Sequence, residues 1–390
     1  MKNFNFSNTP KLYFGEGTFD KIKDIILSYG NRVLLITGGS SFEKSIYNRN
    51  LLSDLEKSNI KYYKENVKNE PSPKIVDEIS KKYRKDNISV VLAVGGGSVM
   101  DTGKAVSAML TKLDSVKEYL EGIGEKQHDG NKIPFIAVPT TSGTGSEATK
   151  NAVISEVGSN GFKKSLRHDN FVPNCAVIDP RLTASCPKSV TAASGMDAFS
   201  QLIEAYLSCD ASPMTDSLAL SGLENIKDGL IESYENGENL DARGKVAYAS
   251  YLSGVVLANA GLGTVHGFAS PIGGYFDIPH GVVCGTLIGE LIRINIKKLS
   301  TDSKKNTVYL EKYAEVGRIF SGKKTLKREA ACEALVDEVK RLTEVMKIPK
   351  LGRYGITEQD LDKIIEKTGN KNNPVKLTKE ELKEMLINRL

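Results

Sequence analysis

The sequence predicts an α/β domain followed by an all-α domain, and three observations support this fold class. In the first half, short β-branched and apolar runs end in glycine, serine, threonine or proline, and they alternate with segments of helical period. In the second half, long helical segments dominate and convincing strands are absent. The chain has 390 residues, which exceeds an ordinary single core, so two domains are expected. We expect them to span 1–185 and 186–390.

Four strands are expected in the α/β half. Continuous apolar strands that alternate with helices indicate a parallel sheet covered on both faces. The intervening helices are expected over 42–58 and 73–85, and capping boxes at Thr357 and Thr378 begin two helices of the second half. The strand segments are NRVLLITGGSS (31–41), ISVVLAVGGGS (88–98), IPFIAVPTTSGTGSE (133–147) and CAVIDP (175–180).

Composition excludes several classes of protein. Apolar residues make up 40% and charged residues 26% of the chain, an ordinary globular balance. The net charge of +5 is mild and carries no basic and aromatic stripe, so no nucleic-acid partner is expected. No run of about 18 apolar residues and no signal peptide is present, so we expect no membrane partner and a cytoplasmic location. The five cysteines lack CxxC spacing, which predicts buried thiols without disulfides or a zinc knuckle.

The segment VLAVGGGSVMDTGKAV (91–106) runs from a strand through three glycines into a helix. Glycine lets a ligand approach the backbone closely, and the first turn of a helix attracts phosphate. Ser98 and Asp101 have the spacing of a capping box that opens the helix. Neither common phosphate motif matches, because GxGxxG needs a small residue at Met100 and a P-loop needs serine or threonine after Lys104.

A second donor-rich loop, PTTSGTGSE (139–147), also follows an apolar strand. In a parallel sheet both loops lie at the carboxyl ends of their strands, where such sheets bind ligands. Two such loops suit a dinucleotide, with one loop at the diphosphate and the other at the nicotinamide end. The alternative for the glycine segment is a tight strand-to-helix turn without a ligand.

Only four histidines occur in the chain, and His266 and His280 both fall in the glycine-rich segment GLGTVHGFASPIGGYFDIPHG (261–281). Upstream, SGMDAFSQLIEAYLS has helical period and places Asp197 and Gln201 side by side, four residues apart. Such a pair alone is more often a solvated polar face. Two histidines with a carboxylate are typical ligands of zinc and non-haem iron, so we hypothesise a divalent-metal site.

Five segments, in this order, resemble the iron-containing (group III) alcohol dehydrogenase family. They are the two donor-rich loops, NCAVIDPRLT (174–183) and the two segments that hold the aspartate and the histidines. The resemblance runs along nearly the whole chain. It implies the dehydroquinate synthase-like fold, with an N-terminal dinucleotide-binding domain and an all-helical metal- and substrate-binding domain. It also implies an NAD(P)-dependent alcohol dehydrogenase, or aldehyde reductase, that uses NAD(P)H and a divalent metal (Fe²⁺ or Zn²⁺) and forms a homodimer through N-terminal strands.

The resemblance also implies roles for single residues. Asp197, His266 and His280 match metal ligands, whereas Gln201 stands in place of a third ligating histidine and offers only a weaker amide oxygen. Ser270 stands where the family has a further histidine near the substrate, so we assign it a proton relay and count it as catalytic with His266 and His280. The expected cofactor contacts are Gly38, Ser40, Gly95, Gly96, Gly97, Ser98, Asp101, Thr140, Thr141 and Thr144.

Cofactor preference is indicated by the residue that follows the first predicted strand. Members of the family that prefer NAD often have an acidic residue at the position of Gly38. Glycine there, with Ser40 and Ser41, leaves room and donors for a 2′-phosphate, so we expect NADP(H) to be accepted. The residues expected to border the substrate pocket are Asn151, Lys163 and Lys164.

Three alternatives stay open. A metal-independent NAD(P)H reductase on the same scaffold is favoured by Gln201 and Ser270. A lyase of the dehydroquinate synthase type is disfavoured by the ordered GMDA, VHGF and PHG motifs. A non-catalytic nucleotide-binding protein would bind NADPH without turnover.

Overall fold

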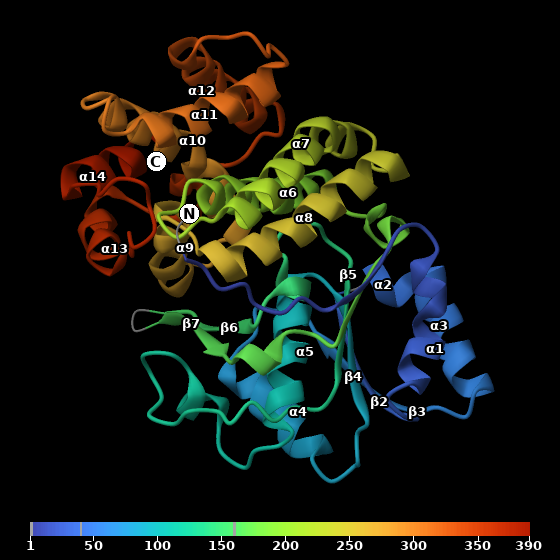
Figure 1. Cartoon of the computed structure of the whole chain (residues 1–390). Coiled ribbons are helices and arrows are strands. Elements are labelled where there is room, and N and C mark those ends of the chain that lie inside the picture. The colour runs from blue at the N-terminus through green and yellow to red at the C-terminus, as the bar shows by residue number, and fades with distance from the viewer. Residues whose placement is uncertain (1–2, 40, 159–160) are drawn as a thin grey trace.

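The computed structural model describes residues 3–39, 41–158 and 161–390 (Figure 1). Its N-terminal domain is a six-stranded sheet with the strand order β1-β8-β5-β4-β2-β3. Neighbouring strands are parallel throughout. The strands are β1 (Lys11–Phe14), β2 (Arg32–Gly38), β3 (Lys61–Val67), β4 (Val90–Gly95), β5 (Phe135–Pro139) and β8 (Cys175–Ile178).

Helices cover both faces of the sheet, as the continuous apolar strands predict. Leu34 and Ile36 of β2 pack into the cluster that includes α4 and α5, whereas Val33 and Leu35 pack into the cluster that includes α1 and α3. Figure 1 shows these two helix layers on opposite sides of the sheet. The helices are α1 (Ile22–Leu27), α2 (Ser41–Lys44), α3 (Ile46–Lys57), α4 (Pro73–Tyr83) and α5 (Gly97–Met109).

A separate antiparallel hairpin, β6 (Asn151–Glu156) with β7 (Phe162–Arg167), leaves the sheet domain and contacts α9. The remaining chain is helical and stands over the sheet in Figure 1. Its helices are α6 (Lys188–Tyr206), α7 (Pro213–Glu235), α8 (Leu240–Ala260), α9 (Thr264–Tyr275), α10 (His280–Ser300), α11 (Thr307–Ser321), α12 (Arg328–Val345), α13 (Leu361–Lys367) and α14 (Lys379–Ile387).

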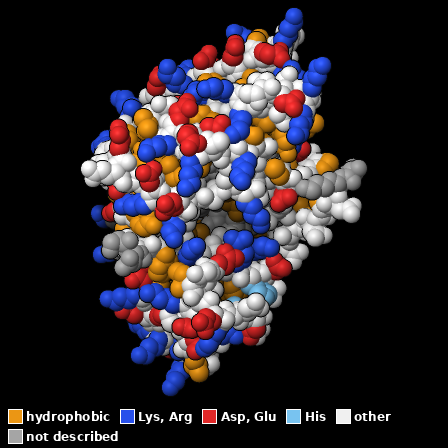
Figure 2. All heavy atoms as spheres, turned by 90° about the vertical axis from the view of Figure 1, so that its left-hand side faces the viewer, with side chains coloured by type: hydrophobic (Ala, Val, Ile, Leu, Met, Phe, Trp, Pro, Cys, Tyr) orange, Lys and Arg blue, Asp and Glu red, His pale blue; other side chains and the backbone are white. Residues whose placement is uncertain are grey.

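The surface in Figure 2 carries lysine and arginine side chains interspersed with aspartate and glutamate. Within the described residues, no single helix has both the length and the apolar character needed to cross a membrane. In the described part of the chain, α8 and α9 meet those criteria when they are taken together, although they are bent by 99°.

Several sequence predictions differ from the structure in detail. The helix expected over 42–58 is divided at Ser45, whose side chain accepts from the Asn48 N–H and caps α3. Both predicted capping boxes are present, at Thr357 and Thr378. The prediction that all cysteines are buried is wrong for Cys209, which is exposed, and for Cys186, which is half-buried.

Candidate active site

A cleft of about 1370 Å³ lies between the two donor-rich loops of the sheet domain and helices α6, α9 and α10. The predicted cofactor and metal residues that the structure describes all line it, as does Ser270. Ser40, the remaining predicted contact, lies outside the described residues. The predicted residues along the cleft are Gly38, Gly95, Gly96, Gly97, Ser98, Asp101, Thr140, Thr141, Thr144, Asp197, Gln201, His266, Ser270 and His280.

The glycine turn is packed directly against the second loop. The Thr140 N–H donates to the Gly95 carbonyl at 2.8 Å. A Cβ added at Gly95 would come within 2.6 Å of Val99 Cγ2, and one added at Gly97 within 2.6 Å of Thr144 Cγ2. Glycine is therefore required for this close approach, which leaves the N-terminal turn of α5 facing the cleft with its backbone N–H groups.

The predicted capping box at Ser98 and Asp101 is wrong. Ser98 already lies in the first turn of α5, and no side chain caps that helix. The Ser98 hydroxyl donates to Glu70 Oε1 at 3.0 Å. The Asp101 carboxylate instead accepts from Ser146 Oγ at 2.5 Å and from the Val153 N–H at 3.1 Å. Asp101 thus anchors the second loop and the hairpin to α5.

Lys104 is fully buried beneath the second loop. Its Nζ lies 2.8 Å from the Ser146 carbonyl, 2.9 Å from Thr149 Oγ1 and 2.8 Å from the Asn151 carbonyl. Burial lowers the pKa of Lys104 to about 8, against the opposing effect of Asp101. Sequence reasoning treated this lysine only as a mismatch to the P-loop and missed its role in holding the loop.

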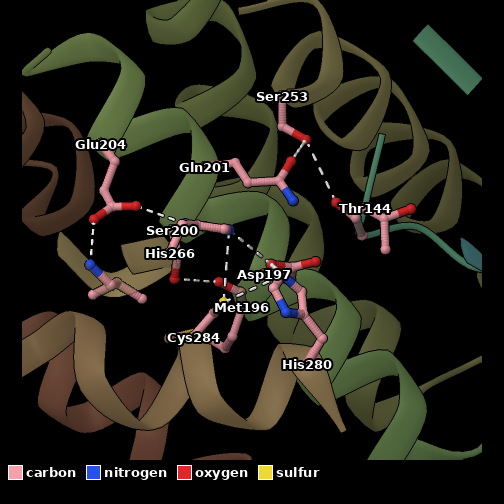
Figure 3. A network of polar contacts seen from close by, with 12 residues as sticks. Thr144, Met196, Asp197, Ser200, Gln201, Glu204, Ser253, His266, His280 and Cys284 are labelled. Atoms are coloured by element: carbon pink, nitrogen blue, oxygen red, sulfur yellow. Dashed lines mark hydrogen bonds and ion pairs between the residues drawn. The ribbon is translucent and has the colours of Figure 1, made fainter. Parts of the chain in front are cut away.

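Three helices bring the predicted metal ligands together (Figure 3). Asp197 lies on α6, His266 on α9, and His280 is the first residue of α10. Asp197 Oδ1 lies 3.3 Å from His266 Nε2 and 3.6 Å from His280 Nε2. It is buried and, among the described residues, makes no hydrogen bond. A buried carboxylate oxygen aimed between two imidazole nitrogens fits a divalent cation.

The pKa values of the two histidines in the cluster shift in opposite directions. Burial lowers the pKa of His280 to about 4. Burial also acts to lower the pKa of His266, but the Cys284 sulfur and the Asp197 and Glu204 carboxylates hold that pKa well above its ordinary value. Burial acts to raise the pKa of Asp197, but His280 and His266 hold it below its ordinary value. A carboxylate and neutral His280 are the forms in which these groups ligate metal.

Glu204 orients His266, a role that the sequence reasoning missed. Glu204 Oε2 lies 2.6 Å from His266 Nδ1, and Glu204 Oε1 accepts from the Val265 N–H at 2.7 Å. A carboxylate at Nδ1 keeps a proton there, so that Nε2 would serve as the ligand once a cation displaces its proton, a common arrangement behind metal-bound histidines. The available signal was the spacing, because Glu204 follows Asp197 by seven residues and lies on the same helix face.

Cys284 also joins the cluster, which the sequence reasoning missed. Its ligand atom and those of Asp197, His266 and His280 all lie within 4.8 Å of one another. Cys284 follows His280 by four residues on α10, so both side chains lie on one face of the helix. Burial raises the pKa of its thiol to about 12.

Gln201 and Ser270 line the cleft but have hydrogen-bond partners within the protein. The Ser253 hydroxyl donates to the Gln201 amide oxygen at 2.7 Å, and Figure 3 shows that oxygen directed at Ser253. The Ser270 hydroxyl donates to the Lys163 carbonyl at 3.1 Å. Each therefore needs a change of partner before it can take the role that the resemblance implies.

Two of the three residues expected at the substrate pocket line the cleft. Asn151 and Lys163 do so, and Lys163 Nζ pairs with Glu70 at 3.1 Å. Lys164 is exposed and is not among the described residues along the cleft, because successive side chains of β7 face opposite sides.

Comparisons with known proteins identify a family along both halves of the chain. Residues 9–180 match the family model described as iron-containing alcohol dehydrogenase, and residues 191–390 match the C-terminal model of Fe-containing alcohol dehydrogenases. An NADPH-dependent butanol dehydrogenase of Clostridium saccharobutylicum is 31% identical, with 97% of this chain and 96% of that protein covered.

Solved structures agree with the sequence relatives. An alcohol dehydrogenase from Oenococcus oeni superposes with a TM-score of 0.88 at 32% identity and covers 100% of both chains. A sulfoacetaldehyde reductase from Bifidobacterium kashiwanohense in complex with NAD⁺ superposes with a TM-score of 0.85 at 27% identity, with 100% of this chain and 99% of that chain covered.

The chain belongs to the iron-containing alcohol dehydrogenase family. It is an oxidoreductase that interconverts alcohols and aldehydes, and its family uses NAD(P) and a metal. The predicted fold class, an α/β domain followed by an all-helical domain, is confirmed.

Proposed function

We propose that this enzyme reduces aldehydes with NADPH, with a divalent cation, Fe²⁺ or Zn²⁺, held by Asp197, His266 and His280. One observation carries the proposal: the buried Asp197 Oδ1, without a hydrogen-bond partner among the described residues, lies between two imidazole nitrogens in the cleft that also contains the glycine turn. Gln201 lines the same cleft and is the fourth ligand that the family resemblance predicts.

The chain's own residues divide the work. The backbone N–H groups from Gly95 to Ser98 bind the diphosphate, and Thr140, Thr141 and Thr144 orient the ribose and nicotinamide. A bound divalent cation supplies Lewis-acid polarisation of a carbonyl, and a bound reduced nicotinamide supplies hydride. Ser270 Oγ moves the proton: its hydroxyl turns from the Lys163 carbonyl and donates to the product oxygen, with water restoring the hydrogen.

NADP(H) preference is supported by the edge of the sheet beside Gly38. A Cβ at Gly38 would come within 2.6 Å of Val99 Cγ2, so an acidic side chain there would have to displace Val99. Gly38 pairs in register with Val67 of β3, and Lys68, the next residue, lines the same cleft. A lysine at this edge attracts a 2′-phosphate where a carboxylate would repel it.

We also propose a domain division, a homodimer and a cellular location. We divide the chain into domains 1–185 and 186–390, since the sheet ends at Ile178 and α6 begins at Lys188. A homodimer that pairs through the β1 edge is supported by the exposed Leu12 and Phe14 on that strand. A cytoplasmic location is supported by Cys175, Cys284 and Cys332, which are buried thiols as expected in a reducing compartment.

The test is elemental analysis of protein purified without chelators, combined with NADPH oxidation over a panel of aldehydes. The proposal expects about one iron or zinc ion per chain, as a single cluster of this kind holds, and aldehyde-dependent oxidation of NADPH. Turnover by protein that contains neither metal would favour the metal-independent reductase. Metal-loaded protein that binds NADPH and reduces none of the aldehydes would contradict the proposed reaction.

A further inference from the structure

Cys284 lies at the metal cluster although nothing in its immediate sequence marks it as a ligand. It is fully buried, and its Sγ lies 3.6 Å from His266 Nε2 and 3.7 Å from His280 Nε2. Figure 3 shows it on the opposite side of the cluster from Gln201. We propose that the Cys284 thiolate is the fourth protein ligand of the cation, alongside Asp197, His266 and His280; this rests on the metal site proposed above.

The distances fit a tetrahedral ligand set. Ligand atoms at 2.0–2.3 Å from a zinc ion lie about 3.3–3.7 Å apart at tetrahedral angles. Asp197 Oδ1 lies 3.3 and 3.6 Å from the Nε2 atoms of His266 and His280. Cys284 Sγ lies 3.6 and 3.7 Å from the same two atoms. The carboxylate and the sulfur thus stand at tetrahedral spacing from both imidazole nitrogens.

Hydrogen bonding favours Cys284 over Gln201 as the fourth ligand. The amide oxygen of Gln201 accepts from Ser253 Oγ at 2.7 Å, which directs that oxygen toward α8. Cys284 Sγ contacts His266 Nε2 and His280 Nε2 and lies within 4.8 Å of the Asp197 ligand atom. A cation between Asp197 and the two histidines could therefore be coordinated by Cys284 while the hydrogen bond from Ser253 to Gln201 stays intact.

Charge also favours the thiolate. Asp197 and Cys284 are both buried, and a carboxylate with a thiolate balances the two positive charges of the cation. Gln201 is neutral and would add no charge at the ligand atoms, whereas the nearby Glu204 carboxylate lies behind His266 at Nδ1 and does not face the cation. The thiol proton is released to solvent as the metal–sulfur bond forms.

The proposal has a consequence for the metal. A set of one thiolate, two imidazoles and one carboxylate is softer than the aspartate and three histidines of the family pattern, and it favours zinc. Four protein ligands fill a tetrahedron, so access for a substrate oxygen requires five-coordination, which zinc allows.

The test uses the full chain, stripped of metal and loaded with Co²⁺. The wild-type protein should show a sulfur-to-cobalt charge-transfer band in the near ultraviolet as well as d–d bands in the visible. Cys284→Ser should lose the charge-transfer band and bind zinc at least about 100-fold more weakly. Loss of a residue that only hydrogen-bonds to a ligand already lowers metal affinity about 10–100-fold. Gln201→Ala and Cys332→Ser, which removes another buried cysteine, should keep the band.

The outcomes separate this inference from the metal site itself. Bound cobalt with d–d bands but without a sulfur band, or a sulfur band that survives Cys284→Ser, would overturn the inference and leave the metal site standing. Failure of the wild type to bind cobalt would overturn both. Because Cys284→Ser can fail to fold, X-ray absorption on zinc-loaded wild type gives a second readout, with one sulfur expected at about 2.3 Å.

Discussion

The Glu204 carboxylate lies 2.6 Å from His266 Nδ1, so one helix, α6, supplies both Asp197 to the metal cluster and the carboxylate that orients a histidine behind it. The Glu204 side chain is 2% exposed. Its other oxygen accepts from the Val265 N–H. Glu204 therefore connects α6 to α9 through a buried carboxylate, each oxygen of which has a hydrogen-bond partner.

Glu204→Gln should weaken metal binding without abolishing the fold. Glutamine has one acceptor oxygen, so it cannot serve both the His266 Nδ1–H and the Val265 N–H. We expect metal affinity to fall about 10–100-fold, the usual effect of losing such a partner. Competition with a coloured chelator measures it. Glu224→Gln on the exposed face of α7 is the control, and equal affinities in the two variants would refute the orienting role.

Gly97→Ala should impair cofactor binding through the packing of the two loops. The added Cβ would meet Thr144 Cγ2 at 2.6 Å, so the loops must separate. Overpacking of this kind costs about 1–3 kcal/mol. We expect a smaller rise in melting temperature on NADPH addition than the wild type shows. Gly369→Ala, where a Cβ meets nothing within 4 Å, should behave as wild type.

Lys68→Ala should reduce the preference for NADPH over NADH. An exposed lysine paired with phosphate contributes about 1 kcal/mol or less, so the ratio of kcat/KM values should fall about fivefold. The loss should appear in KM for NADPH and leave KM for NADH unchanged. A parallel change for both cofactors would mean that Lys68 does not distinguish the 2′-phosphate.

Lys104→Met should destabilise the protein, because four oxygens of Ser146, Thr149 and Asn151 lose a donor. Unsatisfied buried acceptors cost about 1–3 kcal/mol each, so we expect a loss of a few kcal/mol in urea denaturation. Lys112 lies just after the same helix, and its partner is the exposed Asp129. Lys112→Met should therefore lower the free energy of unfolding much less. Equal losses in the two variants would contradict the role of Lys104.

The stability of the wild type should also rise with pH because of Lys104. Its pKa is lowered from 10.5 to about 8 in the folded chain. Between those values the unfolded chain binds a proton that the folded chain has released, so the free energy of unfolding increases with pH, by up to about 1.4 kcal/mol per pH unit. Urea denaturation from pH 7 to 9.5 measures this slope. The slope should be smaller in Lys104→Met, and an unchanged slope would refute the assignment.

The parallel sheet was predictable where its strands are buried on both faces. The strands β2, β4 and β5 are continuous apolar runs followed by turn residues, which is the pattern of such a strand. The strand β3 reads KYYKENV, and β1 is largely exposed. Both are edge strands with little apolar signal, so their pairing depends on the neighbours that the sheet provides.

The site was predictable in part, where its residues stand in recognisable motifs. Asp197, His266 and His280 stand in motifs that resemble the family, and the structure brings them together. The spacing of Glu204 from Asp197 and of Cys284 from His280 indicates only a shared helix face. Their contacts with His266 depend on how α9 and α10 pack against α6, which that spacing does not specify. The capping box at Ser98 failed because α5 begins two residues earlier than that box requires, at Gly97 with Gly96 as its N-cap.

The most direct test of the account is the rate of NADPH oxidation by one aldehyde before and after complete removal of metal. Because Lewis-acid stabilisation contributes several kcal/mol, we expect the rate to fall by about 100-fold or more. Readdition of Zn²⁺ or Fe²⁺ should restore it, while NADPH binding to the metal-free protein persists. An undiminished rate in protein shown by elemental analysis to hold no metal would contradict the central claim.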